Sequence, residues 1–185
     1  MMTKTNKVGF VAGLVGPAII KVAEGYKLGV QAVNPNCDVY TAYTGSTEDV
    51  QKSKEAAQAM IDKGVDLIGG GGNASNAGMI KACEEAGVYA FGELEQQNLA
   101  PETVIFCNMN NIENLVLQAV KDTIDGDFQG CIREYGIAAD VAQLTEYNSH
   151  VPQEVKDKLA ECMDQMRSGE LDIPMITEIS DDIIH

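Results

Sequence analysis

The chain has 185 residues and carries 28 acidic against 13 basic side chains, a formal net charge of −15 at pH 7. Such a charge repels phosphate backbones, so nucleic acid is excluded as a partner. Hydrophobic residues make up 45% of the chain, enough for the core of one domain. No run of apolar residues is long enough to span a membrane, so direct membrane insertion is not expected. The sequence as written shows no clear secretory leader, which predicts a cytoplasmic protein, or an extracytoplasmic one if a leader has been removed.

The cysteines and histidines do not form a recognisable site. The five cysteines are widely spaced and form no C-x-x-C pair, and the two histidines have no companion at metal-ligand spacing. An odd number of isolated cysteines favours reduced and mostly buried thiols over disulfides or a zinc site. We therefore expect no metal, no cofactor and no catalytic histidine. The residues are Cys37, Cys83, Cys107, Cys131, Cys162, His150 and His185.

The first half of the chain alternates between apolar β-type runs and segments of helical spacing. Pro17 suits the first turn of a helix, Ser46 and Thr47 are candidate caps, and Gly64 suits the end of a helix. The expected strands are 7–13, 37–45, 65–69, 88–93 and 103–109, and the expected helices are 17–33, 46–64 and 76–87.

The second half is less regular. An amphipathic helix is expected at 111–128, a strand or strand pair at 133–147, and a strongly amphipathic helix at 152–169 with a tail after it. We divide the chain into a lobe, residues 1–150, and a C-terminal helix and tail, residues 151–185, that pack on the lobe or on a partner.

Strands that alternate with helices of this length predict an α/β fold. We expect a parallel five- or six-stranded sheet with helices on both faces, as in a flavodoxin-like single lobe. Sheets of this kind bind ligands beyond the carboxyl ends of their strands. The loops that follow the strands are 13–16, 44–47, 69–75, 92–97 and 107–111.

Four consecutive glycines in the stretch "DLIGGGGNASNAGM" raise three interpretations beyond a Walker phosphate loop, which lacks its Lys-Ser/Thr pair here. Gly69, Gly71 and Ala74 fit a dinucleotide pattern, with Glu93 placed to hold a ribose. The glycines could also line an uncharged pocket where a ligand approaches the backbone closely. The third interpretation is a flexible turn without a ligand.

Several segments together resemble the BMP (basic membrane protein) family: "VGFVAG", "GYKLGVQAVNP", "YTGSTEDVQKSKEAAQAMIDKGVDLI", "GVYAFGE" and "LAPETVIFCNMNNIENLV". The stretch "YNSHVPQEVKDKLAECMDQMRSGELDIP" is similar to that family's closing segment. The resemblance implies a type I periplasmic-binding-protein fold and a relation to ABC-importer binding proteins for purine nucleosides, with some relatives acting as regulators. It covers the family's second lobe and closing segment, and the first lobe is absent from the sequence.

The resemblance also indicates where a ligand would bind. The family's two ligand-binding aspartates fall on Leu94 and Gln96, and its lysine falls on Asn110. A neutral, amide-rich pocket is therefore expected, suited to a nucleobase or another uncharged polar metabolite. Its predicted residues are Leu14, Val15, Gly71, Gly72, Asn73, Ser75, Leu94, Gln96, Asn108 and Asn110.

Three function classes follow. The leading hypothesis is a non-catalytic domain that binds or senses a small molecule. The alternative is a structural or assembly protein descended from a binding protein that has lost its ligand. An enzyme, including a nucleotide-dependent one, is disfavoured, although Glu93 and Glu95 could act as paired acids and Cys107 as a nucleophile.

The helix at 111–128 would belong to the absent lobe in the family, and its apolar stripe must be buried. The helix could fold back on its own sheet and complete a flavodoxin-like domain, or it could pack on a second copy of the chain, with or without exchange of segments. Of these we expect a homodimer. The stripe residues are Ile112, Leu115, Val116, Ala119, Val120 and Ile124.

Overall fold

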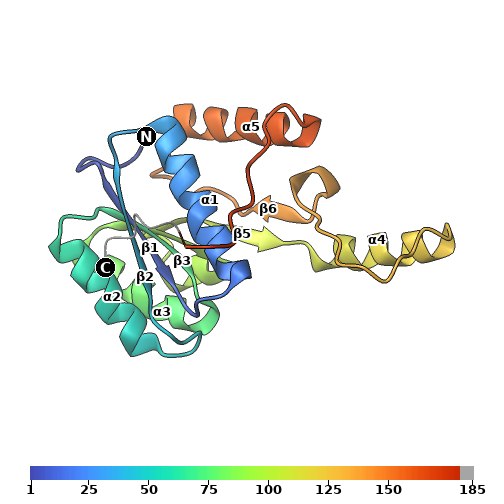
Figure 1. Ribbon diagram of the computed structural model, residues 1–185. Helices are drawn as coiled ribbons and strands as arrows, with labels where there is room; N and C mark the ends of the chain where they lie inside the picture. Colours follow the sequence, from blue (N-terminus) through green and yellow to red (C-terminus); the bar gives the residue numbers. More distant parts are fainter. Residues whose placement is uncertain (180–185) are drawn as a thin grey trace.

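The computed structural model describes residues 1–179 and shows one sheet of six strands flanked by helices (Figure 1). The strand order is β2-β1-β3-β4-β5-β6, with the first five strands parallel and β6 antiparallel to β5. The predicted α/β class and sheet are confirmed. The strands are β1 (Lys7–Ala12), β2 (Asp38–Tyr43), β3 (Leu67–Gly71), β4 (Tyr89–Glu93), β5 (Val104–Asn110) and β6 (Ala142–Leu144). The helices are α1 (Pro17–Val33), α2 (Val50–Asp62), α3 (Asn76–Ala86), α4 (Ile112–Ile124) and α5 (Gln153–Ser168).

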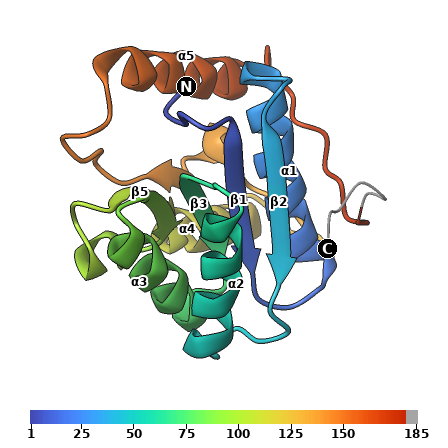
Figure 2. The same ribbon diagram turned by 90° about the vertical axis from the view of Figure 1, so that its left-hand side faces the viewer.

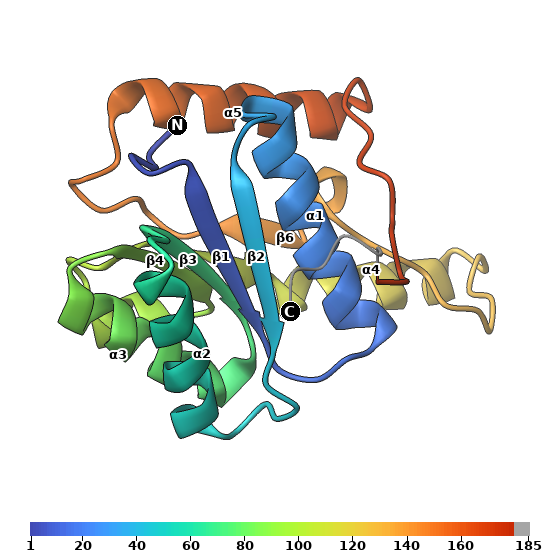
Figure 3. The same cartoon turned by 60° about the vertical axis from the view of Figure 1, so that its left-hand side comes forward.

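Helices cover both faces of the sheet, as predicted. On one face, α2 and α3 pack over a large aliphatic core that includes Met60, Ile68 and Val104. On the other face, α1 covers a smaller aromatic core around Phe10 and Tyr26. Figures 2 and 3 show α1 on the opposite side of the sheet from α2 and α3. The nearly continuous apolar character of the strands follows from this double burial.

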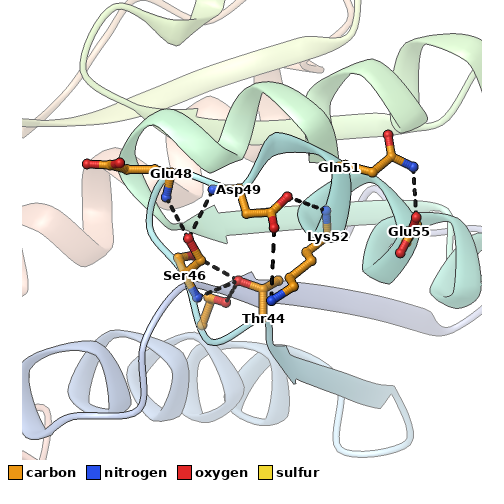
Figure 4. A network of polar contacts seen from close by, with 8 residues as sticks. Thr44, Ser46, Glu48, Asp49, Gln51, Lys52 and Glu55 are labelled. Carbon is orange, nitrogen blue, oxygen red and sulfur yellow. Dashed lines mark hydrogen bonds and ion pairs between the residues drawn. The ribbon is translucent and has the colours of Figure 1, made fainter.

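The loop between β2 and α2 forms a capped turn before the helix begins. The predicted helix at 46–64 starts at Val50, because Asp49 is the N-cap and accepts a hydrogen bond from the Lys52 amide at 3.0 Å. The Ser46 hydroxyl oxygen accepts bonds from the Glu48 and Asp49 amides instead (Figure 4). Ser46 therefore shapes the turn, and the aspartate caps the helix.

The second half departs from the sequence prediction in two places. The strand or strand pair expected at 133–147 is reduced to one strand of three residues, β6, preceded by a short 3₁₀ helix, Ile137–Ala139. The helix expected to reach residue 128 ends at Ile124, because Gly126 adopts a left-handed φ of 77° that terminates the helix.

Two helices lie away from the central layers. Helix α4 extends outward from the end of β5 (Figure 1), and α5 packs beside the 137–139 turn. A groove of about 290 Å³ remains between α5 and the β5–β6 pair. No helix within residues 1–179 is both long and apolar enough to cross a membrane. His185 and the end of the predicted tail, residues 180–185, lie outside the described residues.

Candidate ligand-binding edge of the sheet

The carboxyl ends of the central strands meet at one edge, where backbone bonds join their loops. The Gly13 amide donates to the Gly71 carbonyl at 3.3 Å, which ties the end of β1 to the end of β3. The Gly45 amide donates to the Gly13 carbonyl at 2.9 Å and brings the β2 loop to the same place. The rule that parallel strands gather their following loops is therefore met here.

The four-glycine run belongs mainly to strand β3 and only its last residue to a loop. The expected strand at 65–69 is shifted, and Gly69, Gly70 and Gly71 pair with β1 inside the sheet. A Cβ at Gly69 would collide with the Phe91 ring, and one at Gly70 would lie 2.6 Å from both Asn76 Oδ1 and Met79 Cε. These glycines allow close internal packing. They do not form a flexible turn. They do not form a dinucleotide-binding loop either, because Gly69 and Gly71 of that pattern lie within strand β3.

A network of three side chains and the backbone of Asn73, which we call the strand-end network, links the loop after β3 to the loop after β4. Glu93 Oε2 accepts bonds from the Asn73 amide and from Asn76 Nδ2, each at 3.2 Å. Gln96 Oε1 accepts from the Glu93 amide at 2.9 Å and from Asn76 Nδ2 at 3.2 Å. Gln96 Nε2 donates to the Asn73 carbonyl at 2.8 Å. The two loops are thus held in one fixed arrangement.

The electrostatics of this network are set by one carboxylate without a cationic partner nearby in the loops. Burial raises the pKa of Glu93, while hydrogen bonds from the Asn73 amide and the Asn76 side chain act in the opposite direction. The five loops after the strands contain neither lysine nor arginine. Asn76 is fully buried, and its Oδ1 has no hydrogen-bond partner among the described residues. This edge of the sheet therefore favours ligands that donate hydrogen bonds and disfavours anions.

Two residues of these loops adopt a backbone conformation that is unusual for their type. Asn73 has a φ of 50° and Leu94 a φ of 55°, both in the left-handed region. Asparagine tolerates this region, but leucine is strained there by its Cβ. The Leu94 amide donates to the Asn108 carbonyl at 2.8 Å, and its side chain is 49% exposed. Strain of this kind concentrates at functional sites.

The ten predicted site residues fall into three groups. The strand ends bring Gly72, Asn73, Leu94 and Gln96 together, and Asn108 joins them through its carbonyl. Leu14 and Val15 are exposed in the loop after β1. Gly71, Ser75 and Asn110 do not present a free group to the same place.

The physical reason differs for each of these three residues. The Phe10 ring lies 3.0 Å from where a Cβ of Gly71 would be, so this glycine is covered. Ser75 is 1% exposed, and its hydroxyl donates to the Gly72 carbonyl at 2.8 Å. Asn110 pairs with Ala142 of β6 and lines the groove beside α5.

Sequence reasoning missed Glu93 and Asn76 as members of the site. From the sequence, Glu93 is expected only as a ribose-binding acid or as one of two paired acids with Glu95. In the structure Glu95 is exposed, whereas Glu93 is partly buried and hydrogen-bonded. The sequence feature that could have placed Glu93 in the site is its position as the last residue of a predicted strand. Among residues 1–179, no three His, Cys, Asp or Glu side chains lie close enough together to hold a metal.

The comparison with known proteins agrees with this architecture. The family model described as "ABC transporter substrate-binding protein PnrA-like" matches residues 1–177. The chain belongs to the Bmp family. The resemblance to basic membrane proteins drawn from the sequence is therefore confirmed.

Relatives of the Bmp chain come from several bacteria. The CD4+ T-cell-stimulating antigen of Listeria monocytogenes is 29% identical over an alignment of 194 residues including gaps. The alignment covers 94% of this chain and 54% of that protein. A purine-binding protein of Brucella abortus is 26% identical over 92% of this chain and 48% of its own length. The chain thus spans about half the length of these relatives.

Solved structures show the same fold. A transcriptional activator of the comK gene from Bacillus halodurans superposes with a TM-score of 0.81 at 23% identity, covering 92% of this chain and 59% of that one. An ABC-transporter solute-binding protein from Conexibacter woesei gives a TM-score of 0.78 at 23% identity, covering 95% and 59%. The fold is therefore that of one part of a periplasmic-binding-protein-like molecule.

Proposed function

We propose that this chain is a non-catalytic lobe that binds or senses an uncharged, polar, nucleoside-like metabolite at the strand-end network. The observation that carries the proposal is the Glu93–Asn76–Gln96–Asn73 arrangement, a partly buried carboxylate held by amides in loops without basic side chains. Such a carboxylate accepts hydrogen bonds from ligand hydroxyl or amino groups. It repels phosphate, so nucleotides are disfavoured relative to nucleosides.

The neighbouring side chains suit the remainder of such a ligand. Leu14, Val15 and Leu94 are each about half exposed and offer apolar surface to a flat ring. Gly72 and Ser75 shape the loop against which the ligand would rest, and Gly71 is the last residue of β3 before that loop. Asn108 lies at the margin of this edge, whereas Asn110 lines the groove beside α5 and has no ligand contact in this proposal. No metal, cofactor or nucleic acid has a part in this proposal.

The membership in a substrate-binding family supports the proposal, and the name of the Brucella abortus relative points to purines as the ligand class of that protein. A ligand at an open edge of a sheet needs a second surface to enclose it. We propose that a homodimer supplies it, through equivalent surfaces or exchanged segments. We place the protein outside the cytoplasm, where a substrate-binding protein of an ABC transporter works. Residues 1–150 would form the lobe and residues 151–185 pack on it or on the partner.

A second candidate is an assembly protein that has kept the fold and lost the ligand. The observation in its favour is helix α4, whose apolar side chains Ile112, Val116 and Ile124 are more than half exposed. An assembly protein would keep its subunit contacts and show no ligand response.

Calorimetric titration with nucleosides, nucleobases and sugars, with nucleotides as the anionic comparison, tests the proposal. We expect at least one neutral nucleoside-like compound to bind, and Glu93→Gln to weaken it about tenfold or more, because a charged hydrogen bond contributes roughly 1.5–3 kcal/mol. Glu95→Gln is the matched control, since Glu95 is exposed beside the network. Equal loss in both variants, or no binding of any compound at millimolar concentration, contradicts the proposal.

A further inference from the structure

Helix α4 has one face that the rest of residues 1–179 leaves uncovered. Five large apolar side chains along it are 48–78% exposed, and Phe128 and Ile132 beyond its end are 63% and 95% exposed. Four of the five recur at intervals of four residues, so they form a continuous row along the helix. We call these five residues the α4 stripe: Ile112, Val116, Leu117, Val120 and Ile124.

The opposite face of α4 is covered by the segment that follows it. Asp122 is buried and accepts hydrogen bonds from Arg133 and from the Tyr135 hydroxyl, the latter at 3.0 Å. Gln118 Nε2 also donates to Asp122 at 2.9 Å, and Asn114 Nδ2 donates to the Asp140 carbonyl at 3.3 Å. Leu115, predicted as part of the stripe, is only partly exposed. These contacts determine which face of α4 is covered by the following segment and which face is exposed to solvent.

We infer that the α4 stripe is the docking surface for a second copy of this chain, in an antiparallel α4–α4 pair. This inference rests on the homodimer of the proposed function and selects packing of equivalent surfaces over exchange of segments. In such a pair the symmetry axis passes near residue 118, the midpoint of the stripe. Ile112 of one copy then lies opposite Ile124 of the other, and Val116 lies opposite Val120.

The charges on α4 favour the antiparallel orientation. Glu113 is in the first turn and Lys121 in the last turn. With the axis near residue 118, Glu113 of one copy is displaced about 3 Å along the helix from Lys121 of the other, within reach of a long side chain. A parallel pair would instead place Glu113 against Glu113. The helix dipoles also oppose one another only in the antiparallel arrangement.

The exposed area matches what a stable pair requires. A specific interface buries roughly 800 Å² on each partner. The α4 stripe with Phe128 and Ile132 offers seven large apolar side chains at about half exposure or more, which is an area of that order. Figure 1 shows α4 extending away from the body of the molecule.

Analytical ultracentrifugation of the full chain over micromolar concentrations tests the inference. We expect a monomer–dimer equilibrium that Val116→Asp weakens at least tenfold. Val33→Asp is the matched control, because Val33 in α1 is 53% exposed and Val116 is 55% exposed. Circular dichroism on both variants verifies that they are folded. A wild-type monomer at these concentrations, or a dimer that Val116→Asp leaves unchanged, overturns the inference.

Charge reversal tests the orientation separately. Glu113→Lys and Lys121→Glu should each weaken the dimer several-fold, and the double variant should restore it. Failure of the double variant to recover the wild-type dissociation constant overturns the antiparallel pairing. Sedimentation and nucleoside titration together separate the two proposals. A wild-type monomer, or a dimer that Val116→Asp leaves unchanged, contradicts only the α4 pairing. A wild-type dimer that binds no nucleoside contradicts only the proposed ligand site.

Discussion

At the scale of single residues, Glu93 combines a charge with partial burial. Its carboxylate is held by the Asn73 amide and the Asn76 side chain, and burial still raises its pKa. Proteins keep such a group when its charge serves a ligand, because a neutral glutamine in the same place avoids the cost of desolvation. We therefore expect stability and ligand affinity to respond in opposite directions to the loss of this charge.

Replacing Glu93 should change how stability depends on pH. A carboxyl whose pKa is raised by folding binds more protons in the folded state, so its contribution to stability falls as the pH rises from the unfolded pKa through the folded pKa. Glu93→Gln removes that contribution. We expect the variant to gain melting temperature relative to the wild type at pH 7–8, with the gain vanishing near pH 4. Melting curves across this pH range, with Glu95→Gln as control, check it, and a difference independent of pH contradicts it.

The reactivity of the cysteine thiols should follow their burial. Cys37, Cys83 and Cys107 are buried, Cys162 is partly exposed and Cys131 is exposed. Burial raises the pKa of Cys83 to about 12, so its thiolate is scarce at neutral pH. In a titration of the native protein with a thiol-reactive dye, Cys131 should react first and the three buried thiols only on unfolding. Cys131→Ser should abolish the fast phase, and a fast phase that survives in this variant contradicts the expected burial.

The sequence could predict burial better than it could predict partners. Mostly buried, reduced thiols follow from composition and spacing alone. The role of Glu93 depends on Asn73 and Asn76, which are 20 and 17 residues away in the chain, and on the shift of β3 that carries the glycines into the sheet. Such contacts depend on tertiary register, which periodicity does not encode.

At the scale of elements, helices α2 and α3 owe their close packing to one glycine. A Cβ at Gly78 would collide with the Val50 carbonyl of the neighbouring helix. Backbone cannot yield as a flexible side chain can, so Gly78→Ala should force the helices apart. The structure thus explains a glycine inside a helix, where it otherwise lowers stability.

We expect Gly78→Ala to lower the free energy of unfolding by about 1–3 kcal/mol. Gly29→Ala in α1 is the matched control, because no atom lies within 4 Å of its Cβ position. That change should be neutral or stabilising by up to about 1 kcal/mol through helix propensity. Urea unfolding of both variants measures the difference, and equal stabilities contradict the packing described for Gly78.

The regular elements were predictable where local signals and tertiary contacts agree. Helix α1 begins at Pro17 as expected, since proline needs no hydrogen-bond partner there. The structure of region 133–147 was not predictable from the sequence. Strand β6 has only three residues, and its pairing with β5 depends on a turn held by the carbonyl of Gly136. Short strands carry too little pattern to be separated from loop.

At the scale of the whole molecule, the chain is an α/β lobe of the Bmp family with a candidate ligand edge and an exposed apolar face on α4. The family model matches residues 1–177, and these residues correspond to about half the length of each relative. We propose that this lobe binds one side of a ligand and that a second copy provides the other. Ligand binding and self-association are therefore expected to support each other thermodynamically.

The central claim is that a nucleoside-like ligand binds at the strand-end network, and nuclear magnetic resonance of the ¹⁵N-labelled chain tests it most directly. Titration with adenosine and uridine should shift the amide signals of Gly72, Asn73, Leu94 and Gln96 in a saturable way, and adenosine monophosphate should do so less. No saturable shifts at millimolar nucleoside, or shifts confined to the groove between α5 and the β5–β6 pair, would contradict the account.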